Sequence, residues 1–453
     1  MDTIDRAGRF VPPHPPRPSG PVPVWRGFVG ERARTAVYGW SERAFTLPYF
    51  KRRVFGHDVH IPLDPDLVQH VLLDNAANYV KPDLVKKLIV PTIGRGLLSS
   101  DGPLWREQRR IVAASFAPAA VDMLVPVFAN AVRTSSLGWS RQGGIVDMAA
   151  ASTATTMRVI ADSLFAGDPR LTSEAAMAHI AAALDGVSEA RLQVLLGLPL
   201  IPWSRRGLAG RRGQIYLRRT LAEVVDDRIG KDGEDFLSKL IRALEARFAP
   251  GEARELAIDN AATFYLAGHE TTANALTWTL FLLAEQPDLQ EEAAAEARAA
   301  LSAGEEGIVD RLALVRRILE ESMRLYPPVP RFDRQAVAAD RLGDHDVAPG
   351  DFVSIWPWLI HRHKRLWDEP DAFIADRWQD GAAERHRFQY LPFGGGPRVC
   401  VGARFATTEA LVILAGWLAD WRFDPVPGRE VRASGMVTLR PAGGLPLNVS
   451  ERR

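Results

Sequence analysis

The chain has 453 residues, of which 47% are hydrophobic and 25% are charged, so it can bury a sizeable core and is not disordered by composition. Its formal net charge of +1 gives no whole-protein field that would attract nucleic acid or acidic lipid, so an electrostatic partner would have to use a local patch. The single cysteine excludes an internal disulfide, and neither a signal peptide nor an apolar run of about 20 residues is present, which predicts a cytoplasmic protein with no nucleic-acid partner and no membrane anchor.

Near the N-terminus, residues 9–23 are dense in proline, with the sequence RFVPPHPPRPSGPVP. This composition predicts an extended leader over residues 1–24, followed by a single domain over 25–453. Residues 50–63 alternate in polarity and are rich in β-branched and aromatic side chains. That pattern predicts a hairpin, with a helix after it at residues 64–76.

Helical periodicity dominates from residue 101 to about residue 300. The segment 253–287 is longer than an average helix and apolar on most sides, as expected of a buried central helix. Short strands are expected around residues 351–360 and 436–449. Because the strands are segregated from the helices, the pattern indicates an α+β fold that is mainly helical.

The middle of the predicted central helix carries the sequence GHETT at residues 268–272. Glycine and threonine are poor helix formers, and His269 and Glu270 add ionisable groups to an apolar helix. A threonine hydroxyl can also loosen the local hydrogen-bond ladder and leave room for water. A polar kink without function would explain a lone Glu–Thr pair, but this cluster indicates selection for something other than stability.

Further along the chain, the sequence ESMR places Glu321 and Arg324 three residues apart on one helical face. Side chains at this spacing can form an ion pair. Any surface helix can contain such a pair by chance, so the spacing alone assigns no function.

The only cysteine, Cys400, lies in the sequence LPFGGGPRVCVG. Cysteine acts as a metal ligand or nucleophile only as the thiolate, which is favoured by a nearby arginine and by a helix N-terminus. Arg398 precedes it by two residues, and a helix is expected to follow. A free cysteine is more often a small buried hydrophobe, and zinc is disfavoured because there is no second cysteine.

The spacing of Phe393, Gly394, Gly396, Arg398, Cys400 and Gly402 closely resembles the haem-binding loop of the cytochrome P450 monooxygenases. The sequence AGHETT at residues 267–272 resembles the oxygen-activation motif of the same family, and ESMR resembles its ExxR motif. The resemblance implies the cytochrome P450 fold, with a long central helix and small β-sheets. It also implies haem b as the cofactor, with Cys400 as the ligand of the iron.

Roles for other residues follow from the same resemblance. Thr271 would donate a hydrogen bond to dioxygen, Glu270 would belong to the proton supply, and His269 would be a neighbour and not a catalyst. Phe393 would shield the sulfur, and the haem propionates would be held by Arg398, Trp105, Arg109 and Arg334. The substrate pocket would include Ala267, Val329, Phe332 and Met436, with side chains from the regions 85–94 and 171–228.

The ExxR pair would be completed by Arg377 as a buried structural ion triad. Members of the family usually have Phe where this chain has Trp378, and Pro-Glu where it has Ala375 and Asp376. Because of that departure, the way in which residues 375–378 are held in place is not predicted by the family pattern. The role of Arg377 is not affected.

The implied reaction is R–H + O2 + 2 e⁻ + 2 H⁺ giving R–OH + H2O, on a lipophilic substrate such as a fatty acid, terpene, steroid or alkyl aromatic. The motifs resemble fatty-acid-oxidising branches more than camphor-type ones. Because the chain has no nucleotide-binding loop, electrons are expected from a separate ferredoxin or flavodoxin with its NAD(P)H reductase. The expected docking face surrounds the Cys400 loop, with Arg106, Arg110, Lys364 and Arg365 as a candidate basic patch.

Two other functions are compatible with such a sequence. The first is a peroxygenase or isomerase on the same fold, although Glu270 and Thr271 argue against it. The second is a haem-binding sensor or ligand carrier without turnover, which O2 consumption with product formation would exclude.

Overall fold

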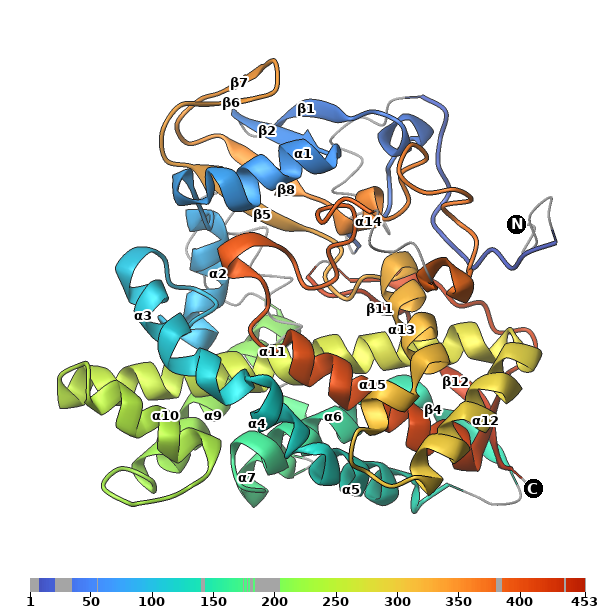
Figure 1. Cartoon of the computed structure of the whole chain (residues 1–453). Helices are drawn as coiled ribbons and strands as arrows, with labels where there is room; N and C mark the ends of the chain where they lie inside the picture. The colour runs from blue at the N-terminus through green and yellow to red at the C-terminus, as the bar shows by residue number, and fades with distance from the viewer. Residues whose placement is uncertain are drawn as a thin grey trace. The chain divides into compact units, whose positions relative to one another are not determined.

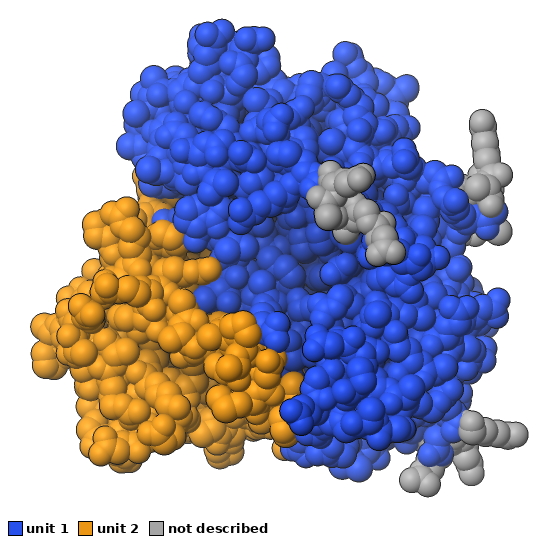
Figure 2. Space-filling view, in the orientation of Figure 1, with its two compact units in different colours: residues 1–80, 128–153, 271–453 blue, residues 81–127, 154–270 orange. Residues whose placement is uncertain are grey.

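A computed structural model describes residues 8–20, 35–54, 56–139, 143–173, 175–176, 178–179, 182–183, 204–379, 385–435 and 437–452. The chain divides into two compact units, which are coloured in Figure 2. Unit 1 comprises residues 1–80, 128–153 and 271–453, and unit 2 comprises residues 81–127 and 154–270. Three of the four divisions fall within helices, namely α5 (Val125–Ser136), α6 (Met148–Leu164) and α11 (Pro250–Ala284).

The largest sheet belongs to unit 1 and contains the hairpin predicted at residues 50–63 (Figure 1). Strand β1 (Tyr49–Val54) pairs antiparallel with β2 (His57–Pro62), which confirms that prediction. Strand β2 runs parallel to β8 (Phe352–Ile355). The sheet continues through β5 (Phe332–Ala336) to β3 (Tyr79–Val80), so strands from both ends of the chain meet in one sheet.

The remaining strands form three small sheets. Strands β4 (Gly144–Asp147), β12 (Pro446–Glu451) and β9 (Trp421–Pro425) form a three-stranded sheet with β12 in the middle. Strands β6 (Asp340–Leu342) and β7 (His345–Val347) form a hairpin, as do β10 (Ala433–Ser434) and β11 (Arg440–Pro441). Small sheets beside many helices confirm the predicted α+β, mainly helical fold class.

Helices contain more residues than strands in both units (Figure 1). Those of unit 1 are α1 (Pro65–Gln69), which runs on into a π-helical turn at His70–Asp74, α12 (Pro287–Ser302), α13 (Ala313–Leu325), α14 (Pro357–Ile360) and α15 (Ala403–Asp420). Those of unit 2 are α2 (Asp83–Ile93), α3 (Gly102–Ala113), α4 (Pro118–Asp122), α7 (Pro169–Thr172), α9 (Arg205–Asp226) and α10 (Phe236–Glu245). The long helix α11 confirms the predicted central helix and begins three residues before it.

Within unit 2, the N-terminal half of α11 holds the loop that follows α2. The carboxylate of Asp259 accepts the backbone N–H of Arg95 at 2.7 Å and a guanidinium N–H of Arg218, from α9, at 2.8 Å. A Cβ atom at Gly94 would overlap that carboxylate, and Gly94 has a φ of +53°. Glycine is therefore required there for both its size and its conformation.

The proline-rich leader is extended in residues 8–20, but it packs against unit 1. The hydroxyl of Tyr326 donates to the carbonyl of Pro13 at 2.7 Å, and Arg17 forms an ion pair with Asp371 at 2.8 Å. The side chain of Arg17 is only 7% exposed. The segment is therefore extended, as the composition predicts, but it is also a packed part of the fold, which the sequence did not predict. Residues 1–7 and 21–24 lie outside the described residues.

Among the described residues, no single helix is long and apolar enough to cross a membrane. Two segments, Gly102–Phe116 and Pro118–Ser136, meet the criteria of length and composition when taken together, but they are bent at the break between them.

Candidate active site

Cys400 lies between a 3₁₀ turn at Gly396–Arg398 and the N-terminus of α15, which begins at Ala403. Its side chain is exposed, unlike that of most free cysteines. The backbone N–H of Cys400 donates to the carbonyl of Phe393 at 3.0 Å and closes the loop. The helix predicted to follow Cys400 is thus confirmed, and the dipole of α15 favours a negative charge at the position of Cys400.

The glycines of the loop are required by close approach and by backbone conformation. Gly394 and Gly396 have φ values of +72° and +67°, which side chains rarely tolerate. A Cβ atom at Gly396 would also overlap the carbonyl oxygen of Leu72, in the π-helical turn after α1. A Cβ atom at Gly395 would lie 2.7 Å from the ring of Phe388. The loop is therefore fixed in one conformation by its neighbours.

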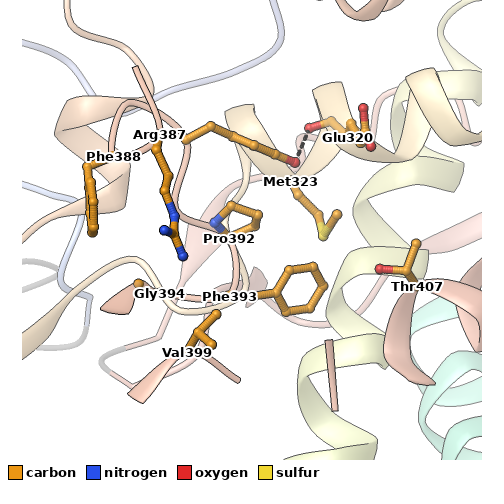
Figure 3. A pocket seen from close by; sticks show the side chains of 11 residues that line it. Glu320, Met323, Arg387, Phe388, Pro392, Phe393, Gly394, Val399 and Thr407 are labelled. Carbon is orange, nitrogen blue, oxygen red and sulfur yellow. Dashed lines mark hydrogen bonds between the residues drawn. The ribbon is translucent and has the colours of Figure 1, made fainter. Parts of the chain in front are cut away.

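Behind this loop, unit 1 contains a cavity of about 320 Å³, which Figure 3 shows from close by. Phe393 and Val399 from the loop and Met323 from α13 line it with apolar surface. Glu320 and Arg387 add ionisable groups to the lining, and burial raises the pKa of Glu320. The ring of Phe393 thus lies at the boundary between the Cys400 loop and a hollow in the protein.

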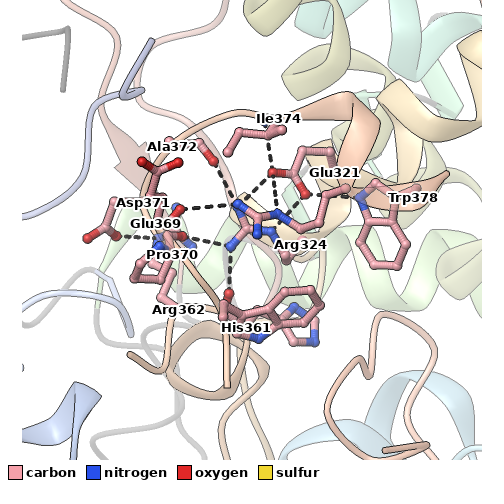
Figure 4. Close-up of polar contacts among 12 residues, drawn as sticks. Glu321, Arg324, His361, Arg362, Glu369, Pro370, Asp371, Ala372, Ile374 and Trp378 are labelled. Atoms are coloured by element: carbon pink, nitrogen blue, oxygen red, sulfur yellow. Dashed lines mark hydrogen bonds and ion pairs between the residues drawn. The ribbon is translucent and has the colours of Figure 1, made fainter. Parts of the chain in front are cut away.

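The predicted ion pair of α13 is present and completely buried (Figure 4). Arg324 binds both carboxylate oxygens of Glu321, at 2.8 and 2.7 Å. Its other N–H groups donate to the carbonyls of His361 and Pro370, each at 2.7 Å, and of Ala372 at 2.9 Å. A guanidinium has five N–H donors, so every one has an acceptor here.

The carboxylate of Glu321 collects donors from the segment after β8 as well. Arg377 donates at 3.3 Å, the backbone N–H of Ile374 at 3.0 Å and the indole N–H of Trp378 at 2.9 Å. Burial by itself would raise the pKa of Glu321, but Arg324, Arg377 and these hydrogen bonds hold it below its ordinary value. The triad is thus assembled, and Trp378, the departure from the family pattern, adds a donor to it.

The middle of α11 is open in an otherwise buried helix. Residues 256–265 and 272–284 are all buried, whereas residues 266–268, 270 and 271 are half-buried or exposed. We call residues 266–271 the α11 window. Ala267, Glu270 and Thr271 lie in it, while His269 and Thr272 are buried. The sequence predicted a special function for this segment, and the window makes three of its side chains accessible.

Helix α6 packs against the back of the window within unit 2. A Cβ atom at Gly268 would lie 2.5 Å from Cδ1 of Ile160, so a larger residue would force α6 to shift. One turn earlier, the hydroxyl of Thr156 donates to the carbonyl of His269 at 3.0 Å. Packing of α6 against α11 is therefore a structural reason for glycine at position 268.

His269 is held inside the protein by its own helix. Its Nδ1 lies 2.6 Å from the carbonyl of Tyr265, which assigns the ring proton to Nδ1 in the neutral form. Burial lowers the pKa of His269, although that hydrogen bond and Glu270 oppose the effect. The imidazole is therefore neutral at pH 7.

One buried ionisable group was missed by the sequence analysis. Glu409 lies on α15 and is completely buried. Burial raises its pKa well above the ordinary value, and the hydroxyl of Thr272 opposes this only in part. Burial therefore favours the protonated form of Glu409. The available signal was an acidic residue at the start of the apolar sequence EALVILAGWLA.

The predicted propionate clamps lie on separate elements. Trp105 and Arg109 are half-buried on α3 in unit 2, one helical turn apart. Arg334 is 9% exposed on β5 in unit 1 and donates to the carbonyl of Asp333 at 3.0 Å. Their role as clamps stays a prediction, as does that of Arg398, which is half-buried.

The predicted substrate-pocket residues are only partly described. Ala267 is exposed in the α11 window, and Val329 and Phe332 are half-buried near the start of β5. Met436 lies outside the described residues. Their assignment to one pocket stays a prediction.

Comparisons with known proteins agree with these motifs. A family model described as cytochrome P450 matches residues 28–443. Cyclooctatin synthase of Streptomyces melanosporofaciens is 34% identical over 391 residues, which cover 84% of this chain and 84% of that protein. Cyclooctat-9-en-7-ol 5-monooxygenase of the same organism is 31% identical over 378 residues, covering 82% of this chain and 81% of that protein.

A plant protein is similar over a comparable length. The chloroplastic carotene epsilon-monooxygenase of Arabidopsis thaliana is 30% identical over 424 residues, covering 86% of this chain and 77% of that protein. The family match over most of the chain, with relatives of this identity and coverage, shows that the chain belongs to the cytochrome P450 family.

Proposed function

We propose that this cytochrome P450 monooxygenase inserts one oxygen atom from O2 into an apolar isoprenoid, with haem b held by the thiolate of Cys400. The observation that carries the proposal is the Cys400 loop. An exposed thiol lies before a helix N-terminus, in a loop whose glycines are fixed by Leu72 and Phe388. A thiolate in such surroundings is stabilised and is available to a metal.

The residues described above fit a haem group. The accessible thiol of Cys400 supplies the ligand, and the α11 window leaves part of an otherwise buried helix uncovered. Arg398, Arg334, Trp105 and Arg109 are the proposed partners of the propionates. When bound, haem with a thiolate ligand supplies the oxygen-activating chemistry.

The protein's own contribution is the handling of protons and the placement of the substrate. We assign Thr271 as the hydrogen-bond donor to the oxygen undergoing reaction, and Glu270 as the group that passes protons inward from solvent. Both are half-buried in the α11 window, where water can reach them. Proton transfer of this kind requires groups within hydrogen-bond reach, directly or through one water molecule.

An isoprenoid substrate is supported by the relatives and by the lining residues. The names of two relatives specify oxidation of cyclooctat-9-en-7-ol and of a carotene. Ala267, Val329 and Phe332, the proposed lining residues, are all apolar. This proposal selects one of the four lipophilic classes expected from the sequence, and it differs from the motifs, which resemble fatty-acid-oxidising branches.

We propose a separate ferredoxin or flavodoxin, reduced by an NAD(P)H-dependent reductase, as the electron donor. Two of the four candidate basic residues already have acidic neighbours, since Lys364 pairs with Glu42 and Arg110 pairs with Glu107 at 2.6 Å. Arg106 and Arg365 are exposed, and neither has an acidic partner among the described residues. They are the better candidates for the docking face.

The absorption spectrum of the purified protein, reduced under carbon monoxide, tests the proposal. The wild type should give the strongly red-shifted Soret band of a thiolate ligand, and Cys400→Ser should lose it. Phe393→Leu is the matched control, because it alters the same loop and keeps the ligand. A histidine-type band in the intact wild type, or no haem at all, would contradict the proposal.

The substrate class is tested separately by titrating the haem protein with a panel of isoprenoids, fatty acids and alkyl aromatics. We expect spin-state shifts with isoprenoid hydrocarbons and alcohols and weaker responses with linear fatty acids. Conversion with a ferredoxin system should then give a hydroxylated product. The opposite order of responses would exclude an isoprenoid while leaving the thiolate ligand intact.

A further inference from the structure

Helix α9 belongs to unit 2 and is labelled in Figure 1. It combines arginine and apolar side chains on one exposed face. Positions 208, 212, 215 and 219 follow the i, i+4, i+7, i+11 spacing of a single helical face. Neighbouring positions 205 and 211 flank this stripe. We define the arginine face as Arg205, Leu208, Arg211, Arg212, Ile215 and Arg219, all of which are exposed.

The opposite side of α9 is buried and fixes the orientation of the helix. Gly210, Gly213, Leu217 and Leu221 are buried there. A Cβ atom at Gly213 would overlap the carbonyl oxygen of His179, so the two backbones are in close contact. Because this side cannot turn outward without losing that contact, the arginine face is held toward solvent.

Two apolar side chains lie among the arginines of this face. Leu208 is 48% exposed and Ile215 is 60% exposed. Single exposed apolar residues are common on protein surfaces and need no explanation. Here both lie on the same stripe as Arg212 and Arg219, so the face offers apolar and cationic groups together.

The arginines of the face differ in their partners from Arg218 of the same helix. Arg218, on the side, binds the buried carboxylate of Asp259 at 2.8 Å. Among the described residues, Arg205, Arg211 and Arg212 have no acidic partner. Arg219 has only Glu223, an exposed side chain one turn away, at 3.0 Å. The net charge of +1 for the whole chain therefore hides a local patch of positive charge.

We propose that the arginine face of α9 binds the surface of a lipid bilayer that contains anionic phospholipids. Guanidinium groups pair well with phosphate, and apolar side chains between them can enter the boundary between head groups and acyl chains. Nucleic acid would match the charge but not the exposed Leu208 and Ile215. In sequence, the helix is preceded by VLLGLPLIPW at residues 194–203, which contains no charged residue and also favours lipid.

This inference goes beyond the proposed function and does not depend on it. The surface is formed by residues of unit 2 alone, whereas the proposed iron ligand belongs to unit 1. If both proposals hold, the enzyme would bind to the lipid bilayer in which its apolar substrate is dissolved.

Co-sedimentation of the full-length haem protein with vesicles tests the inference. Vesicles of phosphatidylcholine alone are compared with vesicles containing about 30% phosphatidylglycerol, at low and at high salt. The wild type should bind the anionic vesicles and bind less as salt rises. Arg205→Gln, Arg211→Gln and Arg212→Gln together should weaken binding on the order of a hundredfold, because each basic residue near an anionic surface contributes severalfold.

The matched control removes the same charge from exposed arginines of unit 1, by Arg43→Gln, Arg133→Gln and Arg298→Gln together. It should bind as the wild type does. Leu208→Ser with Ile215→Ser should keep the attraction at low salt and lose the binding that persists at high salt. Thermal unfolding of each variant confirms that it has folded.

Three outcomes would overturn the inference. They are equal binding to both kinds of vesicle, no binding to either, and a control variant that loses as much as the α9 variant. Binding of a short RNA duplex with no binding of vesicles would assign the face to nucleic acid instead. If the protein keeps its thiolate-type spectrum but does not bind vesicles, this inference is wrong and the proposed function is unaffected.

Discussion

Two glutamates of unit 1 are both completely buried, yet their surroundings shift their pKa values in opposite directions. Glu321 accepts hydrogen bonds from Arg324, Arg377, Trp378 and the backbone of Ile374, and its pKa is lowered. Glu409 has little beside it except the hydroxyl of Thr272, and its pKa is raised. Burial is common to the two sites, so the donors around the carboxyl group determine its charge.

The comparison also explains what each residue can contribute. A charged carboxylate that accepts several hydrogen bonds holds in place the segments that supply the donors. Figure 4 shows donors that converge on Glu321 from several parts of the chain. A neutral carboxyl group with few hydrogen-bond donors around it holds few other segments in place. It can, however, gain or lose a proton at low structural cost, which a carboxylate bound to two arginines cannot.

The largest expected effect is the loss of the main donor to Glu321. Arg324→Met should destabilise the protein by about 3–5 kcal/mol, because a charged carboxylate is left buried without its partner. Urea unfolding, followed by tryptophan fluorescence, measures this. The double variant Glu321→Leu with Arg324→Met removes both charges and should be less destabilised than the single one. Equal losses would mean that packing, not the stranded charge, determines the effect.

The second prediction concerns the pH dependence that Glu409 introduces. A carboxyl group whose pKa is raised on folding stabilises the protein fully below its unfolded pKa, and this stability is lost as pH rises toward the folded pKa. Over that range the wild type should lose about 1.4 kcal/mol per pH unit through this group. Glu409→Gln should lack this contribution, so its advantage over the wild type should grow from pH 5 to pH 8.

The control for this prediction is Glu285→Gln. The pKa of Glu285 is also raised by desolvation, but this residue is exposed. Its stability profile should differ from that of the wild type by much less. Parallel profiles for wild type and Glu409→Gln would show that Glu409 is charged in the folded protein, and the contrast with Glu321 would fail.

How far the sequence predicted these features depends on the distance between the interacting residues. The family, the hairpin at β1–β2 and the central helix were predicted and are confirmed, because each depends on local spacing. The ion pair of Glu321 with Arg324 also follows from spacing along one helix. The role of Trp378 was left in doubt, since its partner lies on a helix far away in the chain.

Other features required contacts that no local pattern contains. Glu409 was not singled out, because its environment is set by elements that are distant in sequence. The packing reason for Gly268 depends on Ile160, and the packed state of residues 8–20 depends on Tyr326 and Asp371. Glycines in a sequence indicate that another part of the protein lies close to the backbone, but they do not identify which residue that is.

The third prediction removes one donor from Glu321 and leaves the charges in place. Trp378→Phe should cost about 1.5–3 kcal/mol, the range for a hydrogen bond to a charged group. Trp367→Phe is the matched control, because the indole of Trp367 donates to the uncharged carbonyl of Ile360 at 3.0 Å. That variant should lose about 0.5–1.5 kcal/mol. Urea unfolding of both proteins gives the comparison, and the reverse order would contradict it.

The smallest effect is expected where the acceptor is neutral and keeps its place in a helix. Thr156→Val removes the hydroxyl that donates to the carbonyl of His269, and it should cost about 1 kcal/mol. Thr156→Ser should restore most of this loss. Because the bond holds the back of the α11 window, amide hydrogen exchange in peptides covering residues 266–271 should be faster in Thr156→Val and near the wild-type rate in Thr156→Ser. A loss as large as that of Arg324→Met would mean that the charge of the acceptor does not set the cost of removing a buried donor in this protein.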